Sequence, residues 1–264
     1  LGLHEELAEA NALGGGIGHI ARAVALARAA ARAGVSSTLF ANSAFLDVLP
    51  LAGEAWGLLA LARLSPAAGP AEAGAALSRL LGSGFEVLVV DTFPRGLGGE
   101  LPPLLGSFPG LKVLVHRDID PEYAQARNLA EAARRFDLLL LPGEHGPLAS
   151  APRAAATDPW LVRAHSELLP CREARAALGA GSGPCLAVMA AGRQAECAAA
   201  AGLAGRLADA FPEAHTVLLD LHGRRAPGAI TCARWPALEL LSAVDLLVGR
   251  SEEHTSELQS PNTI

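Results

Sequence analysis

The sequence predicts an α/β protein with parallel sheets in two successive domains. From residue 14 onward, short apolar runs alternate with helical segments, a pattern typical of strand-helix-strand units. The pattern fades between residues 143 and 183, where Pro, Ser and Gly are frequent, and then resumes. The 264 residues are enough for two modest domains. We predict a first domain at 1–165, a linker at 166–183 and a partial second domain at 184–249.

Near-continuous apolar runs predict strands that are covered on both faces. In the first domain these are FEVLVV at 85–90, KVLVH at 112–116 and DLLLL at 137–141, with a weaker candidate at 38–42. Helices are predicted between them, at 20–33, 71–81 and 121–135. The last has Asp120 placed as a cap and Pro121 at its first position. After a short helix at 172–178, strands are predicted at 185–189, 216–221 and 245–248, and helices at 196–210 and 236–243.

Both ends of the chain are atypical. LGLHEELAEANAL at the start is a poor first strand, because Glu5, Glu6 and Glu9 interrupt what should be a buried apolar run. The stretch RSEEHTSELQS at 250–260 resembles a translated sequencing-library adapter and departs from the Ala-, Leu- and Gly-rich composition before it. We therefore expect native sequence to stop near Gly249 and take 250–264 as a non-native tail.

Charge and composition exclude several classes of protein. A formal net charge of −6 provides no basic surface for a phosphate backbone, so we predict no nucleic-acid partner. The four cysteines are too widely spaced for a CxxC metal or redox pair, and a reducing cytoplasm is the simplest location. Charged residues and a proline interrupt the most apolar stretch, 45–64, which predicts core or a cleft wall, not a membrane span.

A glycine-rich loop runs directly into the first predicted helix. It comprises Gly14, Gly15, Gly16, Ile17, Gly18 and His19. Glycines let the backbone approach a ligand closely, and a helix start presents unpaired N–H groups to a negative or polar group. Such loops occur in NAD, FAD and sugar-nucleotide enzymes. The predicted strand at 38–42 ends in Asn42 and has no Asp or Glu at its end to bind a cofactor ribose. We therefore predict no dinucleotide cofactor.

His19 is the candidate general base. At the first turn of the helix its imidazole would point into a cleft, where the positive helix end would keep it neutral and able to accept a proton. A structural or helix-capping histidine would suit the same position. The sequence leaves both interpretations open.

Polar residues follow every predicted strand of the first domain. They are Asp91, Thr92 and Arg95 after the first run, Arg117 and Asp118 after the second, and Gly143, Glu144 and His145 after the third. Open parallel sheets bind ligands beyond the carboxyl ends of their strands, so we expect these residues to line one edge with the glycine loop. Each of them could equally be an ordinary turn residue.

The second domain offers a comparable turn after its first strand. Gly192, Arg193 and Gln194 precede the helix that begins near Glu196. Backbone amides at this turn could hold a diphosphate, and Arg193 could neutralise it. An ordinary turn between a strand and a helix is the alternative.

Residues 14–34, GGGIGHIARAVALARAAARAG, resemble the first loop and helix of GT-B-fold glycosyltransferases, especially the bacterial lipid-linked N-acetylglucosaminyl transferases of family 28. Gly14, Gly15, Gly18 and His19 match that family's Gly-Gly-x-Gly-Gly-His loop, while Ile17 replaces a glycine. VVDTFPRGLGGEL, HRDI and LLLPGE are similar to segments of predicted bacterial glycosyltransferases. RWPALELLSAVDLLVG at 234–249 is similar to the stretch before their donor-binding glycine loop.

The resemblance implies two Rossmann-like domains in a GT-B arrangement, the second incomplete. It implies inverting, metal-independent transfer of a hexose-type sugar from a UDP-sugar or similar donor to a small-molecule or lipid-linked hydroxyl, in the cytoplasm or at the inner face of the membrane. His19 would be the base and Asp91 its orienting partner or an acceptor contact. The other implied substrate contacts are Gly14, Gly15, Gly16, Gly18, Arg95, Arg117, Asp118 and Glu144, and the implied donor contacts are Gly192, Arg193 and Gln194.

Two other interpretations stay open at this point. A nucleotide-sugar 2-epimerase or hydrolase on the same frame would use carboxylates to move a proton or a water molecule. A non-catalytic nucleotide-sugar-binding fragment is the second. No cofactor or metal is expected, since the DID at 118–120 is interpreted as a strand end followed by a helix cap.

Overall fold

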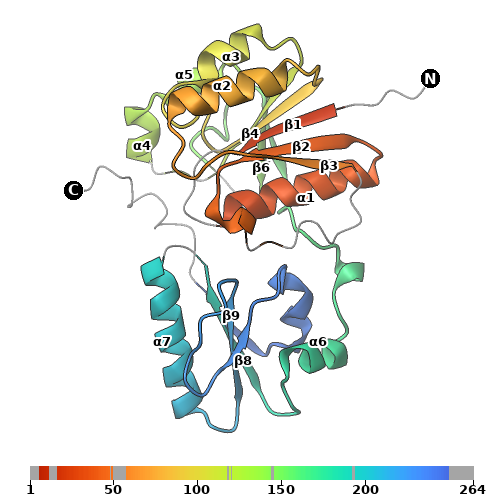
Figure 1. Cartoon of the computed structure of the whole chain (residues 1–264), viewed down its shortest axis with the longest axis vertical. Coiled ribbons are helices and arrows are strands. Elements are labelled where there is room, and N and C mark those ends of the chain that lie inside the picture. The colour runs from red at the N-terminus through yellow and green to blue at the C-terminus, as the bar shows by residue number, and fades with distance from the viewer. Residues whose placement is uncertain are drawn as a thin grey trace.

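A computed structural model describes residues 6–11, 17–47, 49, 58–117, 119, 121–143, 146–191 and 194–249. These residues form two parallel sheets from successive parts of the chain, one above the other in Figure 1. The predicted α/β class with parallel sheets is confirmed. Of the helices within these residues, none combines the length and the apolarity that a membrane crossing requires.

The first sheet has seven strands. Its strands are β1 Glu6–Asn11, β2 Ser36–Ala41, β3 Leu59–Arg63, β4 Val87–Asp91, β5 Leu111–Val115, β6 Leu138–Pro142 and β7 Ala154–Thr157. They lie in the order β3-β2-β1-β4-β5-β6-β7. The helical elements of this part are α1 Gly18–Arg32, η1 Ala44–Asp47, α2 Pro70–Leu81, α3 Leu101–Ser107, α4 Pro121–Ala126 and α5 Leu129–Ala133.

The second sheet has four strands in the order β10-β9-β8-β11. Its strands are β8 Cys185–Ala190, β9 His215–Asp220, β10 Ile230–Cys232 and β11 Leu246–Val248, and its helical elements are η3 His165–Glu167, α6 Cys171–Leu178, α7 Gln194–Ala210 and η4 Ala237–Ala243. Although α6 lies in the predicted linker, its Ala174 and Leu178 belong to the apolar core of this second sheet.

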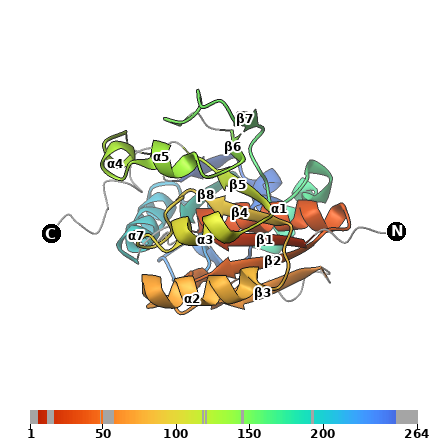
Figure 2. The ribbon, with the colours of Figure 1, turned by 90° about the horizontal axis from the view of Figure 1, so that it is seen from above.

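Helices cover the first sheet on both faces. Figure 1 shows α2 and α3 on one side of it and α1 on the other, and Figure 2 shows the same layers from above. The alternation of side chains along β4 divides the two cores. Leu88 and Val90 pack into the cluster that includes α2 and α3, whereas Val89 packs into the cluster beneath α1. By the same alternation Asp91 is directed toward α1.

Two expectations about individual elements were wrong, and a third was met by a different type of helix. The opening segment was judged a poor strand, yet β1 is paired with both β2 and β4, because sheet pairing is made by backbone groups and tolerates polar side chains. The helix predicted at 121–135 is two short helices, interrupted at Asn128, whose φ of +47° is left-handed. The final helix is the 3₁₀ element η4. β3, β7 and β10 were not predicted.

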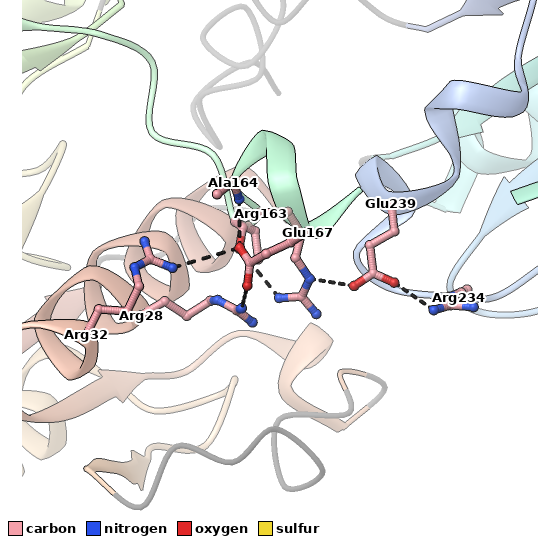
Figure 3. A network of polar contacts seen from close by, with 8 residues as sticks. Arg28, Arg32, Arg163, Ala164, Glu167, Arg234 and Glu239 are labelled. Atoms are coloured by element: carbon pink, nitrogen blue, oxygen red, sulfur yellow. Dashed lines mark hydrogen bonds and ion pairs between the residues drawn. The ribbon is translucent and has the colours of Figure 1, made fainter. Parts of the chain in front are cut away.

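The linker region joins the two sheets through ion pairs, drawn in Figure 3. Glu167 of η3 pairs with Arg28 of α1 and accepts a hydrogen bond from the Ala164 backbone N–H at 2.7 Å. Glu239 of η4 pairs with Arg163. Arg234 Nη2 lies 2.7 Å from Glu239 Oε2. Charged contacts therefore run from α1 through residues 163–167 to the second sheet.

Apolar contacts accompany these ion pairs. Leu221 and Trp235, which follow β9 and β10, pack against an apolar cluster that contains Ile20 of α1, Leu39 of β2 and Phe45 of η1. The rings of Phe45 and His222 lie 5.5 Å apart, between η1 and the loop after β9. An apolar cluster to which α1 contributes Ile20, Ala23 and Val24 is thus part of the contact between the two sheets.

We expect Glu239→Gln to destabilise the fold by about 2–4 kcal/mol, because it removes the carboxylate that pairs directly with the buried Arg163 guanidinium. Burial alone would raise the pKa of Glu239, but hydrogen bonds and charges from Arg163 and Arg234 outweigh burial and lower it. The stabilisation by Glu239 is therefore present at neutral pH and is lost as the pH falls through the lowered pKa. Urea unfolding followed by tryptophan fluorescence measures the loss.

Glu131→Gln is the matched control, because Glu131 forms an exposed ion pair with Arg134 one turn away. Its expected cost is below about 0.5 kcal/mol. Equal losses in the two variants would contradict the importance assigned to the Glu239 pair.

Candidate active site

The spacing of residues along α1 brings two polar side chains over the end of β4. His19 and Arg22 are three residues apart and therefore share one side of the helix. Leu26 and Ala30 continue this stripe and pack on the cluster that contains Val89 of β4. Because α1 starts at the carboxyl end of the sheet, the polar part of the stripe meets the last residue of β4, Asp91.

Asp91, His19 and Arg22 form one hydrogen-bonded group. His19 Nδ1 lies 2.8 Å from Asp91 Oδ2. Arg22 donates from Nε to Asp91 Oδ1 at 3.2 Å and from Nη2 to Oδ2 at 2.9 Å. The Asp91 side chain is 1% exposed, whereas His19 and Arg22 are each 13% exposed. The carboxylate is thus buried beneath two side chains that reach the surface.

Thr92 completes the surroundings of the carboxylate. Its hydroxyl donates to Asp91 Oδ1 at 3.0 Å, and its backbone N–H donates to the Val115 carbonyl oxygen at 2.8 Å. Its φ of +67° is left-handed, which costs a β-branched residue energy. The chain accepts this strain directly beside the buried acid.

The Asp91 carboxyl is held in its charged form. Burial by itself would raise its pKa, but the charges of Arg22 and His19 and their hydrogen bonds outweigh burial and hold the pKa well below the usual range. A carboxylate can only accept hydrogen bonds, so the contact with His19 requires the proton on Nδ1. In the neutral imidazole the other ring nitrogen, Nε2, then carries the lone pair.

This arrangement can perform general-base chemistry. The interactions of His19 with described residues are at Nδ1 and on the ring face, which leaves Nε2 for a substrate proton. After proton transfer, the Asp91 charge stabilises the imidazolium through the same contact. A histidine oriented by a buried carboxylate is a recurring arrangement in catalysis by proton transfer.

A row of rings leads away from the His19 imidazole. The Phe93 ring centroid lies 5.7 Å from that of His19, and the Tyr123 ring lies edge-on to Phe93 at 6.4 Å. The guanidinium of Arg127 lies 5.8 Å from the centroid of the Tyr123 ring. Phe93 and Tyr123 are both partly exposed, so they offer flat apolar surface beside the base.

The other residues predicted for the first domain are placed as follows. Gly18 is the first residue of α1. Arg95 is exposed and donates to the Arg127 carbonyl oxygen at 3.4 Å, and Arg117, which follows β5, is half-buried. The remaining predicted residues lie outside the described residues, namely Gly14, Gly15, Gly16, Asp118, Glu144, Gly192 and Arg193.

Sequence reasoning passed over three residues of this group: Arg22, Thr92 as an Asp91 contact, and Phe93. The signal for Arg22 was available, since a residue three positions after His19 on a helix shares its face. Nothing comparable in the sequence points to Phe93, because its contact with His19 joins separate elements.

Comparison with known proteins identifies the fold. The chain matches no protein-family model and no curated protein. Among solved structures, the glycotransferase of kitacinnamycin is 14% identical with a TM-score of 0.54, covering 94% of this chain and 76% of that one. UGT89C1 of Arabidopsis thaliana, complexed with UDP, is 13% identical with a TM-score of 0.55, covering 94% and 75%. The chain has a GT-B-type fold.

A third structure, MurG of Acinetobacter baumannii, is 14% identical with a TM-score of 0.44, covering 96% of this chain and 68% of that one. A TM-score this low adds nothing to the fold assignment.

In this GT-B-type fold the second sheet also presents charged side chains at its carboxyl end. Asp220 closes β9 and is paired in register with Ala190, the last residue of β8. Arg224 Nη1 lies 3.1 Å from Asp220 Oδ2, and the His222 backbone N–H donates to Asp220 Oδ1 at 2.8 Å. Gln194, the first residue of α7, is exposed, and Figure 1 shows α7 beginning at the end nearer the first sheet.

Proposed function

We propose that the chain transfers a hexose-type sugar from a nucleotide-sugar donor to an acceptor hydroxyl, with inversion at the anomeric carbon and without a metal ion. The observation that carries the proposal is the 2.8 Å contact between His19 Nδ1 and the buried carboxylate of Asp91, at the carboxyl edge of a sheet in a GT-B-type fold. UDP, which is bound in the UGT89C1 structure, is the basis for proposing a UDP-sugar donor.

The reaction follows from a base with a free Nε2. The acceptor O–H gives its proton to His19 Nε2 as its oxygen forms a bond to the anomeric carbon of the sugar. The bond from that carbon to the β-phosphate oxygen breaks, and its electron pair leaves with the nucleoside diphosphate. Attack opposite the leaving group inverts the configuration. Asp91 remains a carboxylate throughout and stabilises the imidazolium.

The acceptor side of the proposal uses the first sheet. Phe93 and Tyr123 would lie against an apolar part of the acceptor, next to the hydroxyl that His19 deprotonates. Arg95, Arg117 and the amides at Gly18 are proposed as polar contacts at the same edge. Gly14, Gly15, Gly16, Asp118 and Glu144 stay proposed contacts on the grounds of their sequence positions.

The donor side uses the second sheet. In the sequence, Gly192 and Arg193 come between β8 and α7 and Gln194 is the first residue of α7; backbone amides at such a helix start suit a diphosphate. Arg224 is a further candidate, since its partner Asp220 neighbours the end of β8. We propose a division into an acceptor-side domain at 1–165, a linker at 166–183 and a donor-side domain from 184.

A two-stage experiment tests the proposal. Thermal unfolding is first measured with UDP, UDP-glucose, UDP-N-acetylglucosamine and NAD. A ligand at 100 times its Kd raises the free energy of unfolding by about 2.7 kcal/mol. We expect stabilisation by UDP and by one UDP-sugar, and stabilisation by NAD alone would overturn the proposal.

The second stage incubates the chain with the stabilising UDP-sugar and a panel of phenolic, sugar and lipid-linked hydroxyl acceptors. Transfer is detected as a new glycoside, its anomeric configuration is read by NMR, and EDTA tests the independence from metal ions. Release of free sugar or epimerised nucleotide-sugar without a glycoside would assign a hydrolase or 2-epimerase instead. Binding without any turnover would assign a nucleotide-sugar-binding fragment.

A further inference from the structure

Arg22 donates hydrogen bonds to the same carboxylate that orients His19, that of Asp91. Its Nε and Nη2 donate to the two oxygens of Asp91 in a forked arrangement, at 3.2 Å and 2.9 Å. His19 Nδ1 shares Oδ2 with Arg22 Nη2, and these two nitrogens lie 3.2 Å apart. Both nitrogens donate to that oxygen, so the guanidinium charge lies directly beside the imidazole.

We propose that Arg22 is a positioning residue that fixes the Asp91 carboxylate and sets the base strength of His19 by offsetting part of the Asp91 charge. The inference rests on the proposed function, in which His19 accepts the acceptor proton. It differs from a simple histidine and carboxylate pair, because two groups, the imidazole and a guanidinium, share one carboxylate oxygen.

The physical effect of Arg22 on His19 has two parts. Its fork holds Oδ2 toward Nδ1, which keeps the lone pair on Nε2. Its positive charge opposes formation of the imidazolium, whereas the Asp91 charge favours it. Burial of Asp91 strengthens both interactions, because water screens them poorly. Formation of the imidazolium is therefore less favourable with Arg22 present than with Asp91 alone.

The groups around His19 make Arg22 the one to test. Within the described part of the chain, the charged side chains in contact with the ring are Asp91 of β4 and Arg22 of α1 itself. The Thr92 hydroxyl lies within 3.5 Å of Arg22 Nη2, and the Phe93 ring flanks the imidazole, so neither brings a charge. Tyr123 of α4 meets the far side of this group through Phe93.

The first test needs no substrate. The His19 ring signals, assigned by their disappearance in His19→Gln, are titrated with pH by NMR in the wild type and in Arg22→Met. We expect the midpoint in Arg22→Met to lie measurably above that of the wild type, because the charge that opposes the imidazolium is gone. Arg22→Lys keeps the charge and should stay close to the wild-type midpoint. Arg134→Met removes an exposed arginine at the end of α5, where it pairs with Glu131, and should leave the His19 midpoint unchanged.

Kinetics provide the second test. The acidic limb of the kcat/KM profile should move upward with the NMR midpoint, and kcat at neutral pH should fall about tenfold in Arg22→Met with the donor KM unchanged. In Arg22→Lys, kcat should fall in part while the acidic limb of the kcat/KM profile stays in place, because one ammonium group cannot hydrogen-bond both Asp91 oxygens as the guanidinium does. Should Arg22→Met not fold, Arg22→Gln removes the charge and keeps a donor.

An unchanged titration and an unchanged pH limb, with only a lower melting temperature, would make Arg22 a structural ion pair and overturn the inference. A raised donor KM with an unchanged titration would assign Arg22 to the diphosphate and overturn it too. Because the NMR titration is independent of substrate, absence of transferase activity would refute the proposed function separately.

Discussion

Replacing His19 with alanine is expected to lower kcat for sugar transfer about 100- to 10,000-fold, the range typical for loss of a general base. His19 Nε2 is the proposed proton acceptor, and the contacts of Asp91 and Arg22 with the ring are at Nδ1 and so cannot replace it. Stabilisation by UDP should persist, because the donor contacts are proposed on the second sheet. Initial-rate kinetics and thermal unfolding on the same protein measure the two quantities.

His165→Ala is the matched control for this variant, since His165 is an exposed histidine of η3. Its kcat should stay within about twofold of the wild type. A His19→Ala enzyme that retains more than about a tenth of the wild-type kcat would show that another group removes the proton.

Asp91→Asn is expected to lower kcat about 1,000-fold and to destabilise the fold as well. An amide offers one oxygen where the carboxylate serves Arg22, His19 and Thr92 at two, and its NH₂ group would face a donor. The imidazolium would lose its counter-charge, and the Arg22 guanidinium would lose its partner. We expect kcat to fall by a similar factor as in His19→Ala, while the unfolding midpoint falls more.

Circular dichroism at the assay temperature separates the two effects of Asp91→Asn. The lowered pKa of Asp91 means that its stabilisation is complete at neutral pH and is lost as the pH falls through that lowered pKa. The wild type should therefore lose stability in acid more steeply than Asp91→Asn. Parallel acid unfolding curves, or a folded Asp91→Asn enzyme with kcat near the wild type, would contradict the role assigned here.

The fold class and the two central side chains of the site could be inferred from the sequence. The run from Val87 to Asp91 is apolar until its last residue, which marks the end of a buried strand, and the glycines before His19 mark a helix start. In a parallel sheet, the carboxyl end of a strand and the start of a helix that follows a neighbouring strand lie at the same edge. The structure places the two side chains in contact, and their catalytic roles stay predictions.

Other features depend on tertiary contacts that local patterns do not encode. In the sequence Arg22 resembles Arg28 and Arg32 on the same helix, and only the position of the helix over β4 separates an Asp91 partner from residues that meet Glu167. The sequence argued against β1 because glutamates interrupt its apolar pattern, whereas the strand is defined by backbone pairing with β2 and β4. The break at Asn128 carries neither glycine nor proline, so the sequence favoured one continuous helix.

The double use of α1 has a further consequence. One stripe of this helix holds His19 and Arg22 over Asp91, while Ile20 belongs to an apolar cluster against which Trp235 and Leu221 of the second sheet's domain pack. A movement of the second sheet would therefore disturb the packing of the cluster to which the helix that carries His19 contributes. Under the proposed function, donor binding at the second sheet and proton removal at the first would be coupled through this cluster, and we expect a substitution at Trp235 to change turnover.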